Sequence, residues 1–136
     1  MKVLVDTSVW SLALRKKEYS EEDKKVIIKL TKMIRQLNLV MIGPIRQEIL
    51  SGIKNKDIFE ELKTKIGIFE DLAIMTQDYE LAAEYFNECR NHGIQGSHVD
   101  YLICAVAVNN KLKIFTLDND FVQYQKYIPI NIEKIA

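Results

Sequence analysis

The N-terminal stretch MKVLVDTSVW, residues 1–10, decides the fold class. Residues 3–5 are apolar at consecutive positions, which is typical of a short strand covered on both faces of a sheet. The run stops at Asp6, which is followed by the hydroxyls of Thr7 and Ser8. A carboxylate in this place is either a helix cap or a group held for chemistry. Other acids arriving at the same place would favour chemistry.

Five short apolar runs recur along the chain and predict five strands. They lie at residues 2–5, 39–42, 72–75, 112–115 and 128–132. Helix-like segments separate them, and this alternation predicts a mainly parallel sheet with helices on both faces. We therefore expect a single α/β domain over residues 1–136, a three-layer α/β/α sandwich.

The helical segments have recognisable starts and apolar faces. The clearest is 20–37, where Ser20 can cap and apolar residues recur at helical spacing. Further helices are expected from Pro44 onward and at about 55–70, 77–91 and 97–110. Trp10, Cys89 and Cys104 are interpreted as core residues.

The composition excludes several classes of protein. Of 136 residues, 48% are hydrophobic and 28% charged, as in a globular protein. Nineteen basic and nineteen acidic residues cancel, which argues against strong nonspecific attraction to nucleic acid. No apolar run approaches the roughly 18 residues of a membrane-spanning helix, and no signal peptide is evident, so we expect a cytoplasmic protein without a membrane partner.

Acids from remote parts of the chain are expected at one edge of the sheet. In a parallel alternation, strand C-terminal ends and the helix N-termini that border them share an edge, where ligands bind. Five acids map to this edge: Asp6, Glu48, Asp100, Asp118 and Asp120. Because crowded carboxylates resist joint ionisation, such a cluster favours a cation, and an all-oxygen ligand set favours Mg²⁺ or Mn²⁺. This points to phosphate chemistry, and no P-loop motif is present.

Each acid also has a purely structural interpretation. Asp6 could cap a helix, and Asp100 completes a Ser97-x-x-Asp100 capping box. Asp118 and Asp120 could make a turn, and Glu48 could lie at a solvated edge. The expected convergence of all these acids favours the functional interpretation.

Four motifs, in order, resemble the PIN-domain endoribonucleases, specifically the VapC-type toxins of bacterial and archaeal toxin-antitoxin modules. They are DTSVW at 6–10, QEILSG at 47–52, GSHVDYLICAVAV at 96–108 and FTLDNDF at 115–121. The resemblance runs from residue 1 to about 130. It implies a PIN-like fold and a metal-dependent endoribonuclease that acts as a toxin, forms a homodimer and is silenced by a cognate antitoxin.

The resemblance also implies roles for particular residues. Asp6, Glu48, Asp100 and Asp118 would form the catalytic quartet that binds Mg²⁺ or Mn²⁺, with either Asp118 or Asp120 as the closer ligand. The hydroxyls of Thr7, Ser8 and Thr116 would orient the first acid or contact substrate phosphate. Arg15, Lys16, Lys17 and Arg46 are the candidates for holding RNA.

Two alternatives remain open from the sequence. A structure-specific DNA nuclease can have a similar acidic edge, although such chains are usually longer. A noncatalytic binding module could keep the fold, but it would be expected to lose one or more acids, and all four positions are filled here. His98, beside Asp100, is interpreted as a surface residue.

Overall fold

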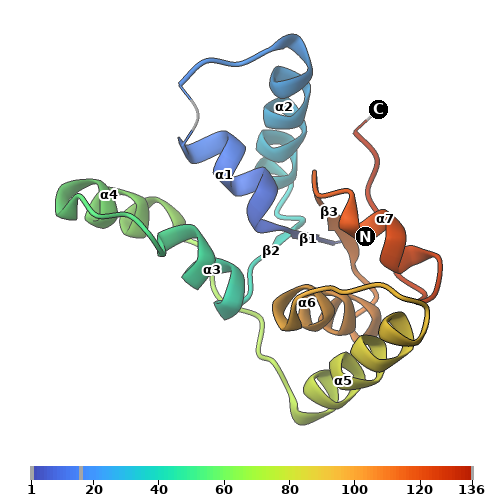
Figure 1. Cartoon of the computed structure of the whole chain (residues 1–136). Helices are drawn as coiled ribbons and strands as arrows, with labels where there is room; N and C mark the ends of the chain where they lie inside the picture. Colours follow the sequence, from blue (N-terminus) through green and yellow to red (C-terminus); the bar gives the residue numbers. More distant parts are fainter. Residues whose placement is uncertain (1, 16, 136) are drawn as a thin grey trace.

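The computed structural model describes residues 2–15 and 17–135 (Figure 1). Three short strands lie at its centre: β1 (Val3–Val5), β2 (Leu39–Val40) and β3 (Lys113–Phe115). The helices are α1 (Thr7–Arg15), α2 (Glu21–Arg35), α3 (Gly43–Leu50), α4 (Lys56–Ile66), α5 (Thr76–Asn91), α6 (His98–Asn109) and α7 (Asp120–Gln125). In Figure 1, α1 and α2 lie on one side of the strands and α5 and α6 on the other, while α4 extends outward. The predicted α/β class with a parallel sheet and helices on both faces is confirmed.

The strand order is β2-β1-β3, and both pairings are parallel. Val3 lies opposite Leu39 on one side and Lys113 on the other. All three residues of β1 are buried, because helices cover both faces of the central strand. The prediction from the apolar run at residues 3–5, a strand covered on both faces, is therefore confirmed.

The predicted count of five strands is wrong for the described residues. The segments expected as strands at 72–75 and 128–132 are irregular, and each edge of the sheet gains only a single bridge, Met41 to Asp71 and Ile114 to Ile132. Pro129 removes a backbone donor from the last segment, which shortens any ladder there. In the segment at 72–75, the Leu72 backbone N–H donates to the Met41 carbonyl at 2.8 Å. The segment then leaves the sheet, because α5 begins at Thr76.

The helix predictions are confirmed, with shifted ends. Ser20 caps α2, and both halves of its capping box with Asp23 are formed. The helix expected at 55–70 ends at Ile66, ahead of Gly67. Trp10, Cys89 and Cys104 are all buried, as predicted for core residues.

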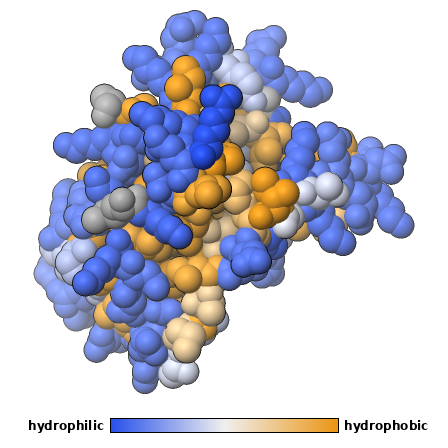
Figure 2. Space-filling model, turned by 180° about the vertical axis from the view of Figure 1, so that it is seen from behind, coloured by the Kyte–Doolittle hydropathy of each residue, from blue (hydrophilic) through white to orange (hydrophobic). Residues whose placement is uncertain are grey.

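The core is continuous across the layers. Helix α6 is buried from Tyr101 to Ala107, so its apolar side chains serve both the sheet and α5. Figure 2 shows the opposite side of the molecule, where apolar side chains gather toward the middle and hydrophilic ones cover the outer parts. Across the described ranges, no helix combines the length and apolarity needed to cross a membrane.

Arg46 ties α3 to the segment that follows α4. Its Nη1 donates to the Ile66 carbonyl at 2.9 Å, its Nη2 donates to the Phe69 carbonyl, and its Nε donates to Asp71 Oδ1 at 3.0 Å. One carbonyl belongs to the last residue of α4 and the other to the segment that follows, so Arg46 holds both against α3. The guanidinium of Arg46 is therefore part of the fold.

We predict that Arg46→Met lowers the free energy of unfolding by about 1–3 kcal/mol, because two partly buried carbonyls lose a charged donor. Urea denaturation followed by circular dichroism measures this change. The matched control is Asp71→Asn, which removes only the charge of the more exposed partner and should cost about 0–1 kcal/mol. Equal midpoints for wild type and Arg46→Met would contradict this role.

Candidate active site

Asp6 is fixed where β1 ends. Its backbone N–H donates to the Phe115 carbonyl at 2.9 Å, which extends the pairing with β3 by one residue. Its side chain is only 6% exposed, and its Oδ2 accepts hydrogen bonds from Ser8 Oγ and Thr116 Oγ1, both at 2.8 Å. The carboxylate thus accepts hydrogen bonds from two side-chain hydroxyls, one on α1 and one on the residue after β3.

The same hydroxyls connect the ends of two strands. Thr116 Oγ1 accepts the Asp118 backbone N–H at 3.0 Å, and Ser8 Oγ accepts that of Leu117 at 2.9 Å. One threonine therefore positions both Asp6 and the backbone that carries Asp118. Thr7, Ser8 and Thr116 were expected to orient the first acid or to contact phosphate. In the structure Ser8 and Thr116 donate to Asp6, whereas Thr7 donates to Glu48, and contact with phosphate stays a prediction.

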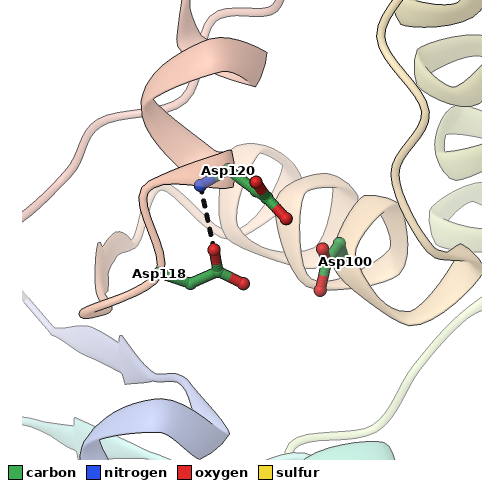
Figure 3. A group of neighbouring side chains, drawn as sticks. All are labelled: Asp100, Asp118 and Asp120. Atoms are coloured by element: carbon green, nitrogen blue, oxygen red, sulfur yellow. Dashed lines mark hydrogen bonds between the residues drawn. The ribbon is translucent and has the colours of Figure 1, made fainter.

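Asp100, Asp118 and Asp120 come together beside this network. One carboxylate oxygen from each lies within 4.8 Å of the others. Figure 3 shows Asp118 and Asp120 on the loop and helix start after β3, facing Asp100 on α6. Asp118 Oδ1 also accepts the Asp120 backbone N–H at 2.9 Å, so the expected turn is formed. Asp118 and Asp120 both belong to the cluster, and the geometry leaves both open as ligands.

Asp100 departs from its expected structural role. Ser97 Oγ accepts the Asp100 backbone N–H at 3.0 Å, which is one half of the predicted capping box. Among the described residues the second half is not formed, because the Asp100 carboxylate instead accepts the Tyr124 hydroxyl at 2.7 Å. The capping box is thus only half present, and the carboxylate is directed to the acidic cluster.

The electrostatics show that these acids affect one another. Burial raises the pKa of Asp100 above its ordinary value, and the charges of Asp6 and Asp118 raise it further, while the hydrogen bond from Tyr124 lowers it. Asp6 is therefore close enough to Asp100 and its neighbours to belong to the same charge cluster.

Glu48 reaches the edge from α3 through a different hydroxyl. Thr7 Oγ1 donates to Glu48 Oε1 at 2.9 Å, so the first residue of α1 connects to α3. Glu48 is exposed and lies outside the group of three aspartates within 4.8 Å. The structure thus brings Glu48 beside the N-terminal end of α1.

The partners of these five acids are neutral. Hydroxyls or a backbone N–H serve Asp6, Glu48, Asp100 and Asp118, and none of the five acids forms an ion pair within the described ranges. Neutral donors orient a carboxylate without cancelling its charge. An all-oxygen donor set with uncancelled negative charge fits a hard divalent cation such as Mg²⁺ or Mn²⁺.

The basic residues expected to hold RNA lie in different settings in the structure. Arg15 Nη2 donates to the carbonyls of Ile49 and Ser51, and Arg46 makes the bonds described above. Lys17 is exposed, and Lys16 lies outside the described residues. Because Arg46 and Glu48 are two positions apart on one helix, they face different directions. His98 is exposed and stacks on Phe86 at a ring distance of 4.9 Å, as expected for a surface residue.

Sequence reasoning missed Tyr124 and Gly96. Tyr124 follows Asp120 by four residues in an aromatic-rich segment that reads as core, and its partner Asp100 is remote in sequence. A Cβ on Gly96 would lie 2.5 Å from the Tyr124 hydroxyl, so glycine is needed there for a close approach. The pattern carried one signal for Tyr124: Asp120 and Tyr124 share a helix face.

The comparisons with solved structures agree with the fold. FitAcB from Neisseria gonorrhoeae is similar with a TM-score of 0.77 and 18% identity, over 98% of this chain and 97% of that chain. VapBC2 from Rickettsia felis, bound to a DNA fragment from its promoter, gives 0.76 and 14%, over 98% of each chain. A toxin-antitoxin complex from Klebsiella pneumoniae gives 0.65 and 15%, over 88% and 90%. At these identities the likeness shows a shared fold.

No curated protein matches the sequence significantly. The PIN domain family, by contrast, matches residues 3–127, which include all five acids of the site. This match covers well over half of the sequence and agrees with the parallel sheet, the acidic edge and the similar structures. The chain therefore belongs to the PIN domain family.

Proposed function

We propose that this protein is a divalent-metal-dependent endoribonuclease that hydrolyses phosphodiester bonds in RNA and acts as a toxin. The observation that carries the proposal is the gathering of Asp6, Asp100, Asp118 and Asp120 at one sheet edge without a cationic partner among the described residues. Membership of the PIN domain family supports nuclease activity, since PIN domains are nucleases. A binding module would not need to retain so many mutually repelling acids.

The proposed cation site uses the aspartates. Asp100, Asp118 and Asp120 would hold the ion, with Asp6 beside them. The chemistry that a bound cation supplies is polarisation of a phosphoryl oxygen and activation of a water. Ser8 and Thr116 keep Asp6 oriented, and Thr7 keeps Glu48 at the same edge, so these hydroxyls contribute by fixing carboxylates.

The uncancelled negative charge of the acidic cluster supports an antitoxin as a partner. Uncancelled carboxylates favour a basic side chain, which is how an antitoxin segment lying over this edge would silence the enzyme. The complex from Klebsiella pneumoniae is a toxin-antitoxin complex, which supports such a partner by analogy of fold. We propose a homodimer on the resemblance noted above. Among the basic residues expected to hold RNA, Arg15 and Lys17 are exposed, and we retain both for RNA contact.

We predict that Asp6→Asn reduces cleavage of RNA by at least about 100-fold, since losing a group that only orients a metal ligand already costs 10–100-fold. Purified protein is incubated with labelled structured and unstructured RNAs and with DNA, in Mg²⁺, in Mn²⁺ and in EDTA. Cleavage should require the metal and be lost in the variant.

Asp78→Asn is the matched control for that variant. Asp78 is the other buried carboxylate of the described residues, and it accepts the Met75 backbone N–H and Asn109 Nδ2, away from the site. This variant should still cut RNA after correction for any loss of folded protein. Cleavage by Asp6→Asn at the wild-type rate would refute the site, and preferential cutting of DNA would favour the DNA nuclease.

We predict that Asp100→Asn raises the melting temperature of the metal-free protein at pH 7. Because the folded-state pKa of Asp100 is raised, its ionisation costs stability above that pKa, and the cost disappears as the pH falls through it. The advantage of the variant should therefore shrink toward acidic pH. Thermal unfolding of both proteins over a pH series measures this.

Added Mn²⁺ should reverse the order of the two proteins. A cation at 100 times its Kd adds about 2.7 kcal/mol to the wild type and much less to a variant that lacks one ligand. A variant that is less stable than the wild type without metal at pH 7 would contradict the raised pKa of Asp100.

A further inference from the structure

Tyr124 connects α7 to the acidic edge. Its ring is 1% exposed, and its hydroxyl donates to Asp100 Oδ2 at 2.7 Å. The Asp100 side chain also interacts with Ser97, and of the two hydroxyls that of Tyr124 lowers the Asp100 pKa more. A buried tyrosine hydroxyl usually finds a partner, and for Tyr124 the partner is a candidate metal ligand.

The position of Tyr124 on α7 joins two ligands of the cluster. Asp120 begins α7, and Tyr124 lies four residues later, so both project from the same face. Asp120 contributes a carboxylate directly, while Tyr124 holds the carboxylate of Asp100 on α6. The hydrogen bond therefore fixes α6 and α7 at the point where their two acids approach within 4.8 Å.

The ring of Tyr124 is fixed on several sides. Phe121 packs against it edge-on at a ring distance of 5.3 Å, and Tyr101 packs at 4.9 Å. Gly96 leaves room for the hydroxyl, because any Cβ there would lie 2.5 Å from it. A rigid ring with a hydroxyl in a tight space sets the direction of the hydrogen bond.

We infer that Tyr124 is a positioning residue that holds Asp100 in the orientation needed to bind the cation. This inference rests on the proposed function. Without the hydroxyl, Asp100 can rotate away from Asp118 and Asp120, whose negative charges repel it. The site would then have to reorder Asp100 on binding, which weakens affinity for the metal.

The test is Tyr124→Phe, which keeps the ring and removes only the hydroxyl. Mn²⁺ affinity measured by titration calorimetry should weaken by about 10-fold. RNA cleavage should fall at limiting Mn²⁺ and return toward the wild-type rate at saturating Mn²⁺. Because metal binding also stabilises the folded state, this recovery supports positioning only if circular dichroism shows Tyr124→Phe fully folded without metal.

Tyr85→Phe is the matched control, because Tyr85 is a buried tyrosine of α5. It should bind Mn²⁺ as the wild type does. Gly96→Ala would place a Cβ 2.5 Å from the Tyr124 hydroxyl and 2.8 Å from that of Tyr101, so it should displace the Tyr124 hydroxyl by a second route and also weaken Mn²⁺ binding. Circular dichroism at the assay temperature gives the folded fraction of each protein.

Two results would overturn the inference, and they are distinguishable. Equal Mn²⁺ affinity of wild type and folded Tyr124→Phe would refute the positioning role while leaving the proposed nuclease intact. A folded wild type that binds no Mn²⁺ would refute both the positioning role and the metal-dependent function.

Discussion

Mutual repulsion among carboxylates is the constraint around which this edge of the molecule is arranged. Asp6 is buried and Asp100 is half-buried, and Asp118 and Asp120 lie close to Asp100. Gathering such charges costs stability that the rest of the fold must offset. The buried apolar core of β1 and α6 supplies that stability. The repulsion among the acids remains, and a bound cation would reduce it.

Hydroxyl groups orient the carboxylates of this edge but do not neutralise their charge. Ser8 and Thr116 fix Asp6, Thr7 fixes Glu48, and the Tyr124 hydroxyl fixes Asp100. Lysine or arginine in these positions would form ion pairs and compete with a metal. The described arginines near this region, Arg15 and Arg46, are instead bonded to backbone carbonyls of the fold. Neutral donors thus leave the negative charge of these acids uncancelled.

Sequence patterns predicted the parts of this structure that depend on local periodicity and topology. The apolar run at residues 3–5 and the strand and helix alternation placed Asp6, Asp100 and Asp118 at one edge, because parallel connectivity fixes where strands end. The predicted number of strands was wrong, because the segments around Asp71 and Ile132 each form only one bridge to the sheet. Tertiary contacts, which the local pattern does not reveal, decide how far such a segment pairs. Tyr124 was missed because its hydrogen bond spans 24 residues and depends on the absence of a side chain at Gly96.

The long sequence separations within the site connect its formation to completion of the fold. The hydrogen bond between Thr116 and Asp6 spans 110 residues, and that between Thr7 and Glu48 spans 41. These contacts form only when β1 lies between β2 and β3, so the unfolded chain has no preformed acidic cluster. A ligand that neutralises the cluster, whether a cation or a basic side chain of a partner, therefore binds the folded state alone and stabilises it. Ligand affinity at this edge and the stability of the sheet are therefore thermodynamically linked.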